Sequence, residues 1–241
     1  FDVSAGGDLS VCAVANCDEF GLYITDGIDY RPSDTSAGDI TTGDFRNEGT
    51  FTLDGNTVRV GGNWNNQATS SLGTGDIIFT ANSGTYDIID HTDSLEFPAV
   101  TFGEGSGSAT WRLNHPLTVA TDLTINYGTV DRFAATTLTV SGDVAIGAAG
   151  VVTGSGTTTF AGSGVSTWSD VSAGQNLGNV VIDGSAKTIG VSGDVEDGAE
   201  DGVVDLDEMS AGEDVVVDID LDISAGGGER GVDRAVAAEQ V

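Results

Sequence analysis

The sequence predicts an all-β chain, folded as a β-solenoid or as tandem β-sandwiches, built from short strands joined by glycine-containing turns. Three observations favour this fold class. Runs rich in Val, Ile, Thr and Phe alternate apolar with polar residues, which is the period of a half-buried strand. Glycine occurs 36 times and proline 3 times, a ratio typical of many tight turns. Similar strand-and-turn units recur at a long offset of about 80 residues and at a shorter one.

The long offset relates two parts of the chain. The segment 57–64, TVRVGGNW, aligns with 137–144, TLTVSGDV, and Phe79 then falls against Phe160. We interpret this similarity as a degenerate internal duplication of about 80 residues. Strands joined by turns roughly every 8 to 12 residues fit two similar β-sandwiches as well as a solenoid, so both folds stay open.

The shorter repeat has the length of one solenoid coil. The segment 137–146, TLTVSGDVAI, is similar to 116–125, PLTVATDLTI, and Val119 stands 21 residues before Val140. Because alternate residues of a strand point to opposite sides, we expect one side to form the core. The inward residues of the later unit are Leu138, Val140, Val144 and Ile146. One coil cannot bury its own apolar side, so each coil must stack on its neighbours.

Residues 1–50 differ from the repeats and are predicted to form an N-terminal cap or a small β unit. The segment 20–32, FGLYITDGIDYRP, indicates two short strands about an Asp-Gly turn. The segment 8–15, DLSVCAVA, indicates a further strand. That strand either caps its own chain or is donated to an exposed sheet edge of a neighbouring copy.

Residues 51–195 form the predicted body of β-repeats. An acidic loop and a closing strand are predicted at 196–225, where VVVDIDLDI at 215–223 alternates apolar residues with aspartates. The aspartates would line the exposed side of this strand and discourage incorrect edge pairing. Residues 226–241, which begin with three glycines, are predicted to be a flexible or short helical tail.

The charge of the chain excludes several kinds of partner. It has 38 acidic and 8 basic residues, for a formal net charge of −30. Nucleic acids and anionic membrane surfaces need clustered Lys and Arg, so we expect neither as a partner. No run approaches the roughly 18 apolar residues of a membrane span, so we expect no membrane insertion. Salt or divalent cations would screen the repulsion, and such acidity is typical of halophilic or marine microbes.

The repeat pattern combines L-T-V-x-G-D-V-x-I, G-x-G-T-x-x-F-x-G-S-G and L-x-N-V-V-I-D-G within roughly residues 50–195. It resembles the β-helical repeats of secreted bacterial and archaeal surface proteins, and is similar to filamentous-haemagglutinin and autotransporter stalks. The resemblance implies an extracellular or cell-surface structural protein, such as a filament, fibre or adhesin subunit. Its partner would be further copies of the chain, in a homo-oligomer or a polymer.

Two other functions fit the same pattern. A carbohydrate-binding or carbohydrate-cleaving β-helix would recognise surface glycans, with Trp64, Trp111 and Trp168 either stacking on sugar rings or packing in the core. A viral fibre or decoration protein would share the same β-rich physics. We predict that the chain is not an enzyme. His91 and His115 are its only histidines, and neither Gly-x-Ser-x-Gly nor His-Glu-x-x-His occurs.

One acidic stretch indicates a calcium loop, weakly similar to those of dockerins. The segment 197–208, DGAEDGVVDLDE, matches most positions of an EF-hand-type loop, with Gly202 at the turn. The oxygen ligands would come from Asp197, Asp201, the Val203 carbonyl, Asp205 and Glu208. Ala199 supplies no side-chain oxygen at the third position, and the neighbouring sequence is also rich in acidic residues. The alternative is a solvated acidic turn without a defined ion.

The chain has two cysteines, Cys12 and Cys17. Their spacing allows a small disulfide loop in an oxidising compartment, in keeping with an extracellular location. The alternative is a pair of free thiols. Because there is no further cysteine and both histidines are distant in sequence, we expect no metal site at this pair.

Overall fold

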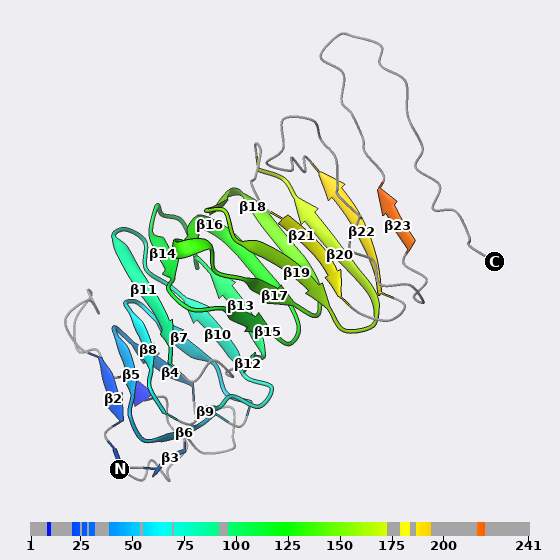
Figure 1. The fold of residues 1–241 in the computed structure, drawn as a ribbon. Helices are drawn as coiled ribbons and strands as arrows, with labels where there is room; N and C mark the ends of the chain where they lie inside the picture. Colours follow the sequence, from blue (N-terminus) through cyan, green and yellow to red (C-terminus); the bar gives the residue numbers. More distant parts are fainter. Residues whose placement is uncertain are drawn as a thin grey trace.

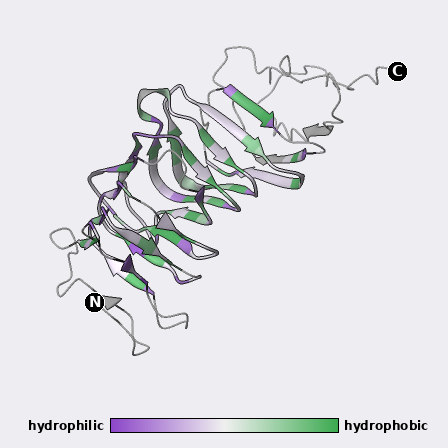
Figure 2. Cartoon of the chain, turned by 60° about the horizontal axis from the view of Figure 1, so that its bottom comes forward, coloured by the Kyte–Doolittle hydropathy of each residue, from purple (hydrophilic) through white to green (hydrophobic). Residues whose placement is uncertain are grey.

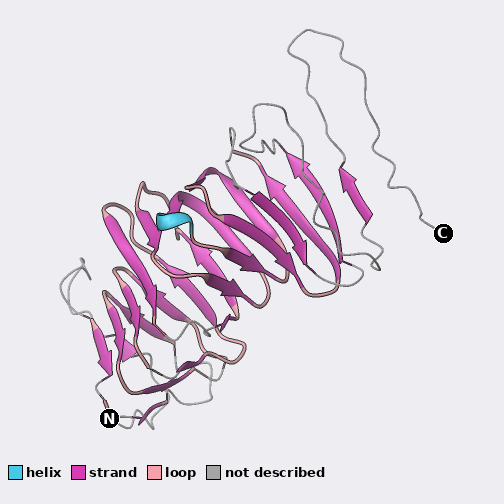
Figure 3. Cartoon of the chain, viewed as in Figure 1, coloured by secondary structure: helices cyan, strands magenta, loops and turns pink. Residues whose placement is uncertain are grey.

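A computed structural model shows a parallel β-solenoid of about seven turns, in which successive coils stack from the N-terminal to the C-terminal end (Figure 1). The structure describes residues 9–10, 21–24, 26–27, 29–31, 39–53, 55–68, 70–91, 96–172, 179–183, 187–193 and 216–219. Strands and the turns between them account for nearly all of this part of the chain (Figure 3). The predicted β-solenoid is confirmed. Because every strand pair in the described part is parallel, tandem sandwiches, which are built from antiparallel sheets, are excluded.

Each coil contributes strands to three faces. The first face keeps a continuous register, in which Val58 pairs with Ile77, Ile77 with Val100 and Val100 with Leu123. Its strands are β1 (Leu9–Ser10), β4 (Ile40–Thr42), β7 (Val58–Val60), β10 (Asp76–Phe79), β13 (Ala99–Phe102), the first part of β16 (Leu123–Asp131), the first part of β18 (Val144–Thr153), β20 (Gly164–Asp170), β22 (Lys187–Gly193) and β23 (Val216–Ile219).

The second face is stacked in the same way, whereas the third face consists of two separate parallel sheets, of three and of five strands. The second face contains β2 (Leu22–Ile24), β5 (Phe45–Asn47), β8 (Trp64–Asn66), β11 (Thr85–Asp90), β14 (Thr110–Leu113) and the later parts of β16 and β18. The third face contains β3 (Asp29–Tyr30), β6 (Thr50–Thr52) and β9 (Ser70–Ser71), followed by β12 (Glu96–Phe97), β15 (Leu117–Val119), β17 (Leu138–Val140), β19 (Thr157–Ala161) and β21 (Asn179–Asp183). A 3-10 turn, η2 (Phe133–Ala135), follows β16.

The corner between the first and second faces requires glycine in β16. Gly128 has a φ of +79°, in the left-handed region that disfavours side chains. A Cβ at this position would lie 2.5 Å from the Ala109 carbonyl oxygen of the preceding coil. A residue without a side chain therefore lets two coils remain in contact where the strand changes direction.

The unit predicted from the shorter repeat is one coil of the solenoid. Val119 and Val140 are register partners in adjacent strands of the third face. The four residues expected to point inward are all buried, namely Leu138, Val140, Val144 and Ile146. The 80-residue offset relates different faces, because Phe79 lies on the first face and Phe160 on the third. The longer similarity therefore reflects a strand-and-turn pattern that the faces share.

The two short strands predicted within 20–32 are β2 and β3, with Asp26 and Gly27 in the turn between them. They do not pair with each other, because β2 pairs with β5 and β3 pairs with β6 of the next coil. The described part of the first predicted strand, β1, pairs with β4 of the same chain. The closing strand is present as β23, which pairs in parallel with β22. The residue bounds of the domains stay a prediction.

Apolar and aromatic side chains fill the interior, and hydrophobic and hydrophilic residues alternate along the strands (Figure 2). Aromatic rings from successive coils stack, with Phe45 and Trp64 centroids 4.0 Å apart. Trp64, Trp111 and Trp168 are 0%, 0% and 4% exposed. The interpretation of these three tryptophans as sugar-stacking platforms is therefore wrong, and core packing is confirmed for them. No helix in the described ranges is long and apolar enough to span a membrane.

Replacing an inward ring should destabilise the solenoid far more than replacing its outward neighbour. Phe102 is fully buried, and its ring stacks on Phe79 at a centroid distance of 4.9 Å. We expect Phe102→Ala to lower the free energy of unfolding by about 3–5 kcal/mol, because it leaves a cavity between coils. Thr101→Ala, on the outward side of the same strand, should change it by less than about 0.5 kcal/mol. Urea denaturation followed by tryptophan fluorescence measures both, and equal effects would contradict the assigned inward side.

Candidate functional site

The residues predicted to form sites lie outside the described residues. This applies to the calcium ligands Asp197, Asp201, Val203, Asp205 and Glu208, and to the cysteines Cys12 and Cys17. Calcium binding and the disulfide therefore stay predictions. Within the described part, the polar residues with defined partners form ladders along the corners of the solenoid, two buried cations and a pair of histidines.

An inner ladder of polar side chains runs along the end of the second face. Asn47, Asn66 and Asp90 are register partners in β5, β8 and β11, and all three are buried. The Asn47 Nδ2 donates to Asn66 Oδ1 at 2.9 Å, and the Asn66 Nδ2 donates to Asp90 Oδ1 at 3.0 Å. Ser70 Oγ donates to Asn66 Oδ1 at 2.8 Å. Since each amide both donates and accepts, stacked coils bury these groups without leaving Asn66 unsatisfied.

An outer ladder occupies the preceding corner and joins four coils. Asp44 Oδ1 accepts from the backbone N and from Nδ2 of Asn63, at 2.7 and 3.0 Å. Asn63 Oδ1 accepts from the backbone N of Asp87 at 2.8 Å, and Asp87 Oδ1 accepts from Asn114 Nδ2 at 2.8 Å. These carboxylates and amides satisfy polar groups of the next coil where the chain turns.

The corner before the first face uses aspartates in the same way. Asp122 Oδ1 accepts from the backbone N of Asp143 at 2.8 Å, and Asp143 Oδ1 accepts from the backbone N of Thr167 at 2.7 Å. Asp39 Oδ1 accepts from the backbone N of Thr57 at 2.9 Å. Part of the acidic composition is therefore structural, because these carboxylates hold consecutive turns together.

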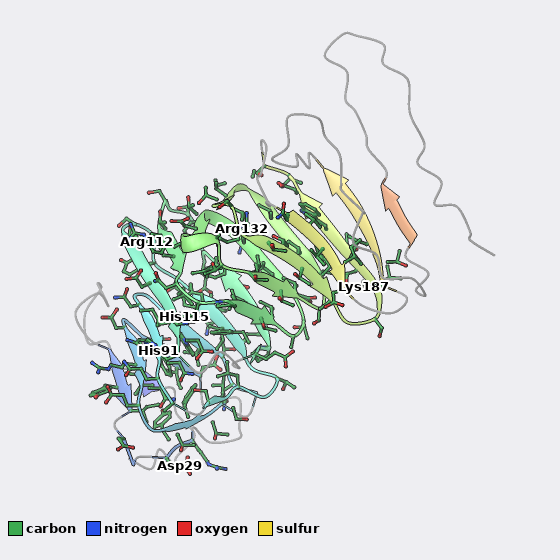
Figure 4. All side chains as sticks on the ribbon, in the orientation of Figure 1. Asp29, His91, Arg112, His115, Arg132 and Lys187 are labelled. Atoms are coloured by element: carbon green, nitrogen blue, oxygen red, sulfur yellow. The ribbon has the colours of Figure 1, made fainter. Side chains whose placement is uncertain are left out.

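Arg132 is a buried cation at the corner between the second and third faces, 1% exposed (Figure 4). Its Nη1 donates to the Gly156 carbonyl and its Nη2 to the Gly154 carbonyl, both at 2.8 Å. Its Nη1 also donates to Thr158 Oγ1 at 3.2 Å. The guanidinium thus binds the turn of the next coil, and burial lowers the pKa of Arg132.

Lys187, the only lysine of the chain, is also fully buried. Its Nζ donates to the Ser141 carbonyl at 2.6 Å and to Ser166 Oγ at 2.7 Å, so it connects β22 to two preceding coils. Burial lowers the pKa of the ammonium, and the negative charge of Asp143 opposes that shift. A lysine in this position serves the packing of the coils and is not available at the surface.

The two histidines lie together although 24 positions separate them in the sequence. His91 directly follows Asp90 of the inner ladder, and His115 directly follows Asn114 of the outer ladder. Their ring centroids are 5.1 Å apart with planes at 64°, and Figure 4 shows the side chains near each other. His91 is exposed and His115 is half-buried. Across the ranges that the structure describes, no group of three or more His, Cys, Asp or Glu side chains is placed to hold a metal ion.

The sequence interpretation missed these arrangements. Asn47 and Asn66 end the strands FRN and WNN, 19 residues apart, and Asp90 ends the next strand, 24 residues later. A polar residue recurring at the same strand end, at the interval of one coil, was the available signal for the inner ladder. The sequence contains no comparable signal for the burial of Arg132 and Lys187, because no basic residue occupies the equivalent position one coil before or after either of them.

Comparisons with family models, with curated proteins and with solved structures find nothing that matches this chain. The function is therefore inferred from the geometry of the described residues.

A carboxylate in the middle of the inner ladder should destabilise the protein in a pH-dependent way. Asn66→Asp removes the donor to Asp90 Oδ1 and places a second carboxylate beside it. We expect a loss of about 3–5 kcal/mol at neutral pH, as for a buried unpaired charge. The introduced carboxyl gains a raised folded-state pKa, so the loss should shrink as the pH falls and the group is protonated.

Urea unfolding between about pH 4 and pH 8 checks this result, with Thr124→Asp on the outward first face as the control for an added charge. That control should stay within about 0.5 kcal/mol of the parent protein. A loss at Asn66 that does not depend on pH would contradict the ladder.

Lys187 should make stability rise with pH in an alkaline window. Its folded-state pKa lies below the ordinary value of 10.5, so between the two values the unfolded chain binds more protons than the folded one. The contribution of this group to the free energy of unfolding therefore increases as pH rises through the folded pKa towards 10.5. Lys187→Met lacks the titrating group.

The stability of the parent protein minus that of Lys187→Met should accordingly rise with pH, as measured by urea unfolding. The tyrosines whose pKa values are raised by burial, such as Tyr30 and Tyr127, are present in both proteins and cancel in the difference. A difference that is flat or falls with pH would show that the ammonium is not buried.

Proposed function

We propose that the chain is a structural segment of an extracellular or cell-surface protein, which self-associates as a subunit of a filament, fibre or adhesive stalk. The observation that carries this proposal is the parallel stack of the first face, which is continuous from β1 to β23, with a filled interior. A solenoid grows along one axis, about 4.8 Å for each coil, so its natural product is a spacer of set length.

The ends of the stack support self-association. In the described part of the chain, β21 pairs with β19 alone and β3 pairs with β6 alone. The inward residues of β21, Val180 and Ile182, are only partly buried, whereas Phe160 one coil earlier is fully buried. Among the described residues, such an edge is open to a further parallel strand and a further apolar layer.

The charge supports a salt-dependent assembly. Three arginines of the described residues have acidic partners: Arg59 contacts Asp39 and Glu104, Arg46 contacts Glu48, and Arg31 contacts Asp29. The net charge of −30 already counts all basic residues, so copies of the chain repel each other at low salt. Salt or divalent cations screen this repulsion and allow close approach.

A glycan-binding function has less support. The three tryptophans that suggested it are buried. The exposed aromatic rings of the described part, Tyr23 and Phe133, each have an arginine over the ring, at 4.9 Å for Arg46 and 5.8 Å for Arg112. Those ring faces are therefore engaged within the chain. The alternative of a viral fibre protein is supported by the same solenoid features as the cell-surface function.

Self-association should appear as salt rises. We expect single particles at about 0.1 M NaCl and linear oligomers at about 3 M NaCl or with added calcium, because screening reduces the repulsion between copies. Sedimentation velocity and negative-stain electron microscopy measure this change. A chain that stays monomeric under all of these conditions would contradict the filament function.

Two variants of β21 locate the contact. Ile182→Asp places a charge on the inward side of the edge strand and should reduce high-salt association at least about tenfold. Val181→Asp adds the same charge on the outward side of the same strand and should leave association unchanged. Equal association of both variants would exclude β21 as the assembling edge.

A further inference from the structure

We propose that His91 and His115 form a binding site for a transition-metal ion such as Zn²⁺, Ni²⁺ or Cu²⁺, held between two adjacent coils. This site is separate from the predicted calcium loop, and it does not depend on the proposed structural function. The inference rests on the position of the two imidazoles, on the separation of their rings and on the chemistry of the ligands.

The fold anchors both histidines at the same corner. Ile88 and Leu113 are register partners in β11 and β14, so the residues that follow these strands emerge side by side. The backbone N of His91 donates to the Asn66 carbonyl at 2.8 Å, and the backbone N of Asn114 donates to the Ile88 carbonyl at 3.1 Å. The two side chains therefore project from fixed backbone positions in neighbouring coils.

One member of the outer ladder, Asn114, directly precedes His115 in the chain. Asn114 Nδ2 donates to Asp87 Oδ1 at 2.8 Å, which ties the residue before His115 to the strand before His91. On the other side, Asp90 accepts from Asn66 Nδ2 within the inner ladder. The backbone positions of both histidines are held in this way, so only the two side chains must reorient when they bind an ion, which favours binding.

The separation of the rings is the one that a shared ion requires. With a metal–nitrogen bond of about 2.0–2.1 Å and a ring nitrogen about 1.1 Å from its centroid, two imidazoles on one tetrahedral ion have centroids about 5.2 Å apart. The observed centroid separation of His91 and His115 is 5.1 Å. A rotation of the rings would therefore bring one nitrogen of each onto a common ion without moving the backbone.

The ligand types select the metal. Neutral imidazole binds Zn²⁺, Cu²⁺ and Ni²⁺, whereas Ca²⁺ and Mg²⁺ prefer oxygen ligands. Within the described ranges no third His, Cys, Asp or Glu side chain joins the two imidazoles. His91 is exposed, which gives the ion access from solvent, and the net charge of −30 concentrates cations around the chain.

A bound ion would link two coils by a contact that the unfolded chain lacks. Binding to the folded state alone raises the apparent stability in proportion to the logarithm of the metal concentration. The site thus offers the solenoid a metal-dependent reinforcement at a corner that otherwise relies on the ladders.

Isothermal titration of the full chain with ZnCl₂ tests the site. We expect one ion per chain at this site, with affinity reduced at least about tenfold in His91→Ala and in His115→Ala, because each loses a direct ligand. Asp76→Asn is the matched control, since it removes one exposed carboxylate outside the ladders but keeps both imidazoles. Its zinc affinity should stay within about threefold of the parent value, and CaCl₂ should not compete for the site.

Two results would overturn the proposal. One is equal zinc binding by the parent protein and the His91→Ala, His115→Ala double variant, which would indicate diffuse attraction to the acidic surface. The other is a Cu²⁺ electron paramagnetic resonance spectrum of the parent protein without coupling to two imidazole nitrogens. The spectrum needs no variant, so it decides the matter even if a histidine substitution prevents folding.

Discussion

Parallel hydrogen bonding between successive coils, in register, is the constraint on which this structure depends. It places Val58, Ile77, Val100 and Leu123 directly over one another along the first face. Strands so paired lie about 4.8 Å apart, so an inward side chain lies over its register partner in the next coil. Along this face the partners are apolar in successive coils, and the rings of Phe79 and Phe102 stack with centroids 4.9 Å apart.

The same constraint applies to polar residues. A buried amide can occupy the interior corner only if the coils above and below bring a complementary group to the same position, as Asn66 finds in Asn47 and Asp90. At corners where the sequence has no such repeat, the side chain of a buried arginine or lysine forms the hydrogen bonds between coils. Arg132 and Lys187 reach the carbonyl groups of neighbouring turns that would otherwise have lost their partners in water. The inner ladder and the two buried cations thus satisfy polar groups between successive coils.

Much of the coil could be predicted from the sequence, because its cause is local. The alternation of TLTV and PLTV sets which side of each strand is apolar, and the 21 residues between Val119 and Val140 correspond to one coil. The 80-residue similarity was a poorer guide to the stacking. The three faces share one strand-and-turn pattern, so an alignment can match Phe79 of one face with Phe160 of another.

The sequence by itself indicated the β-strands, their turns and the inward side of the 137–146 unit, since these follow from hydrophobic period and turn residues. It left a solenoid and tandem sandwiches open, and the parallel pairing of the coils decided between them. Only the tertiary structure decided which distant residues meet. Trp64 and Trp111 are core residues because their strands turn that side inward, a matter of register that residue type does not reveal. His91 and His115 approach each other because the coil between them closes after 24 residues, a length set by irregular turns. Which residues of two coils come into contact depends on the lengths of all the turns between them. A short segment of sequence does not reveal that total length.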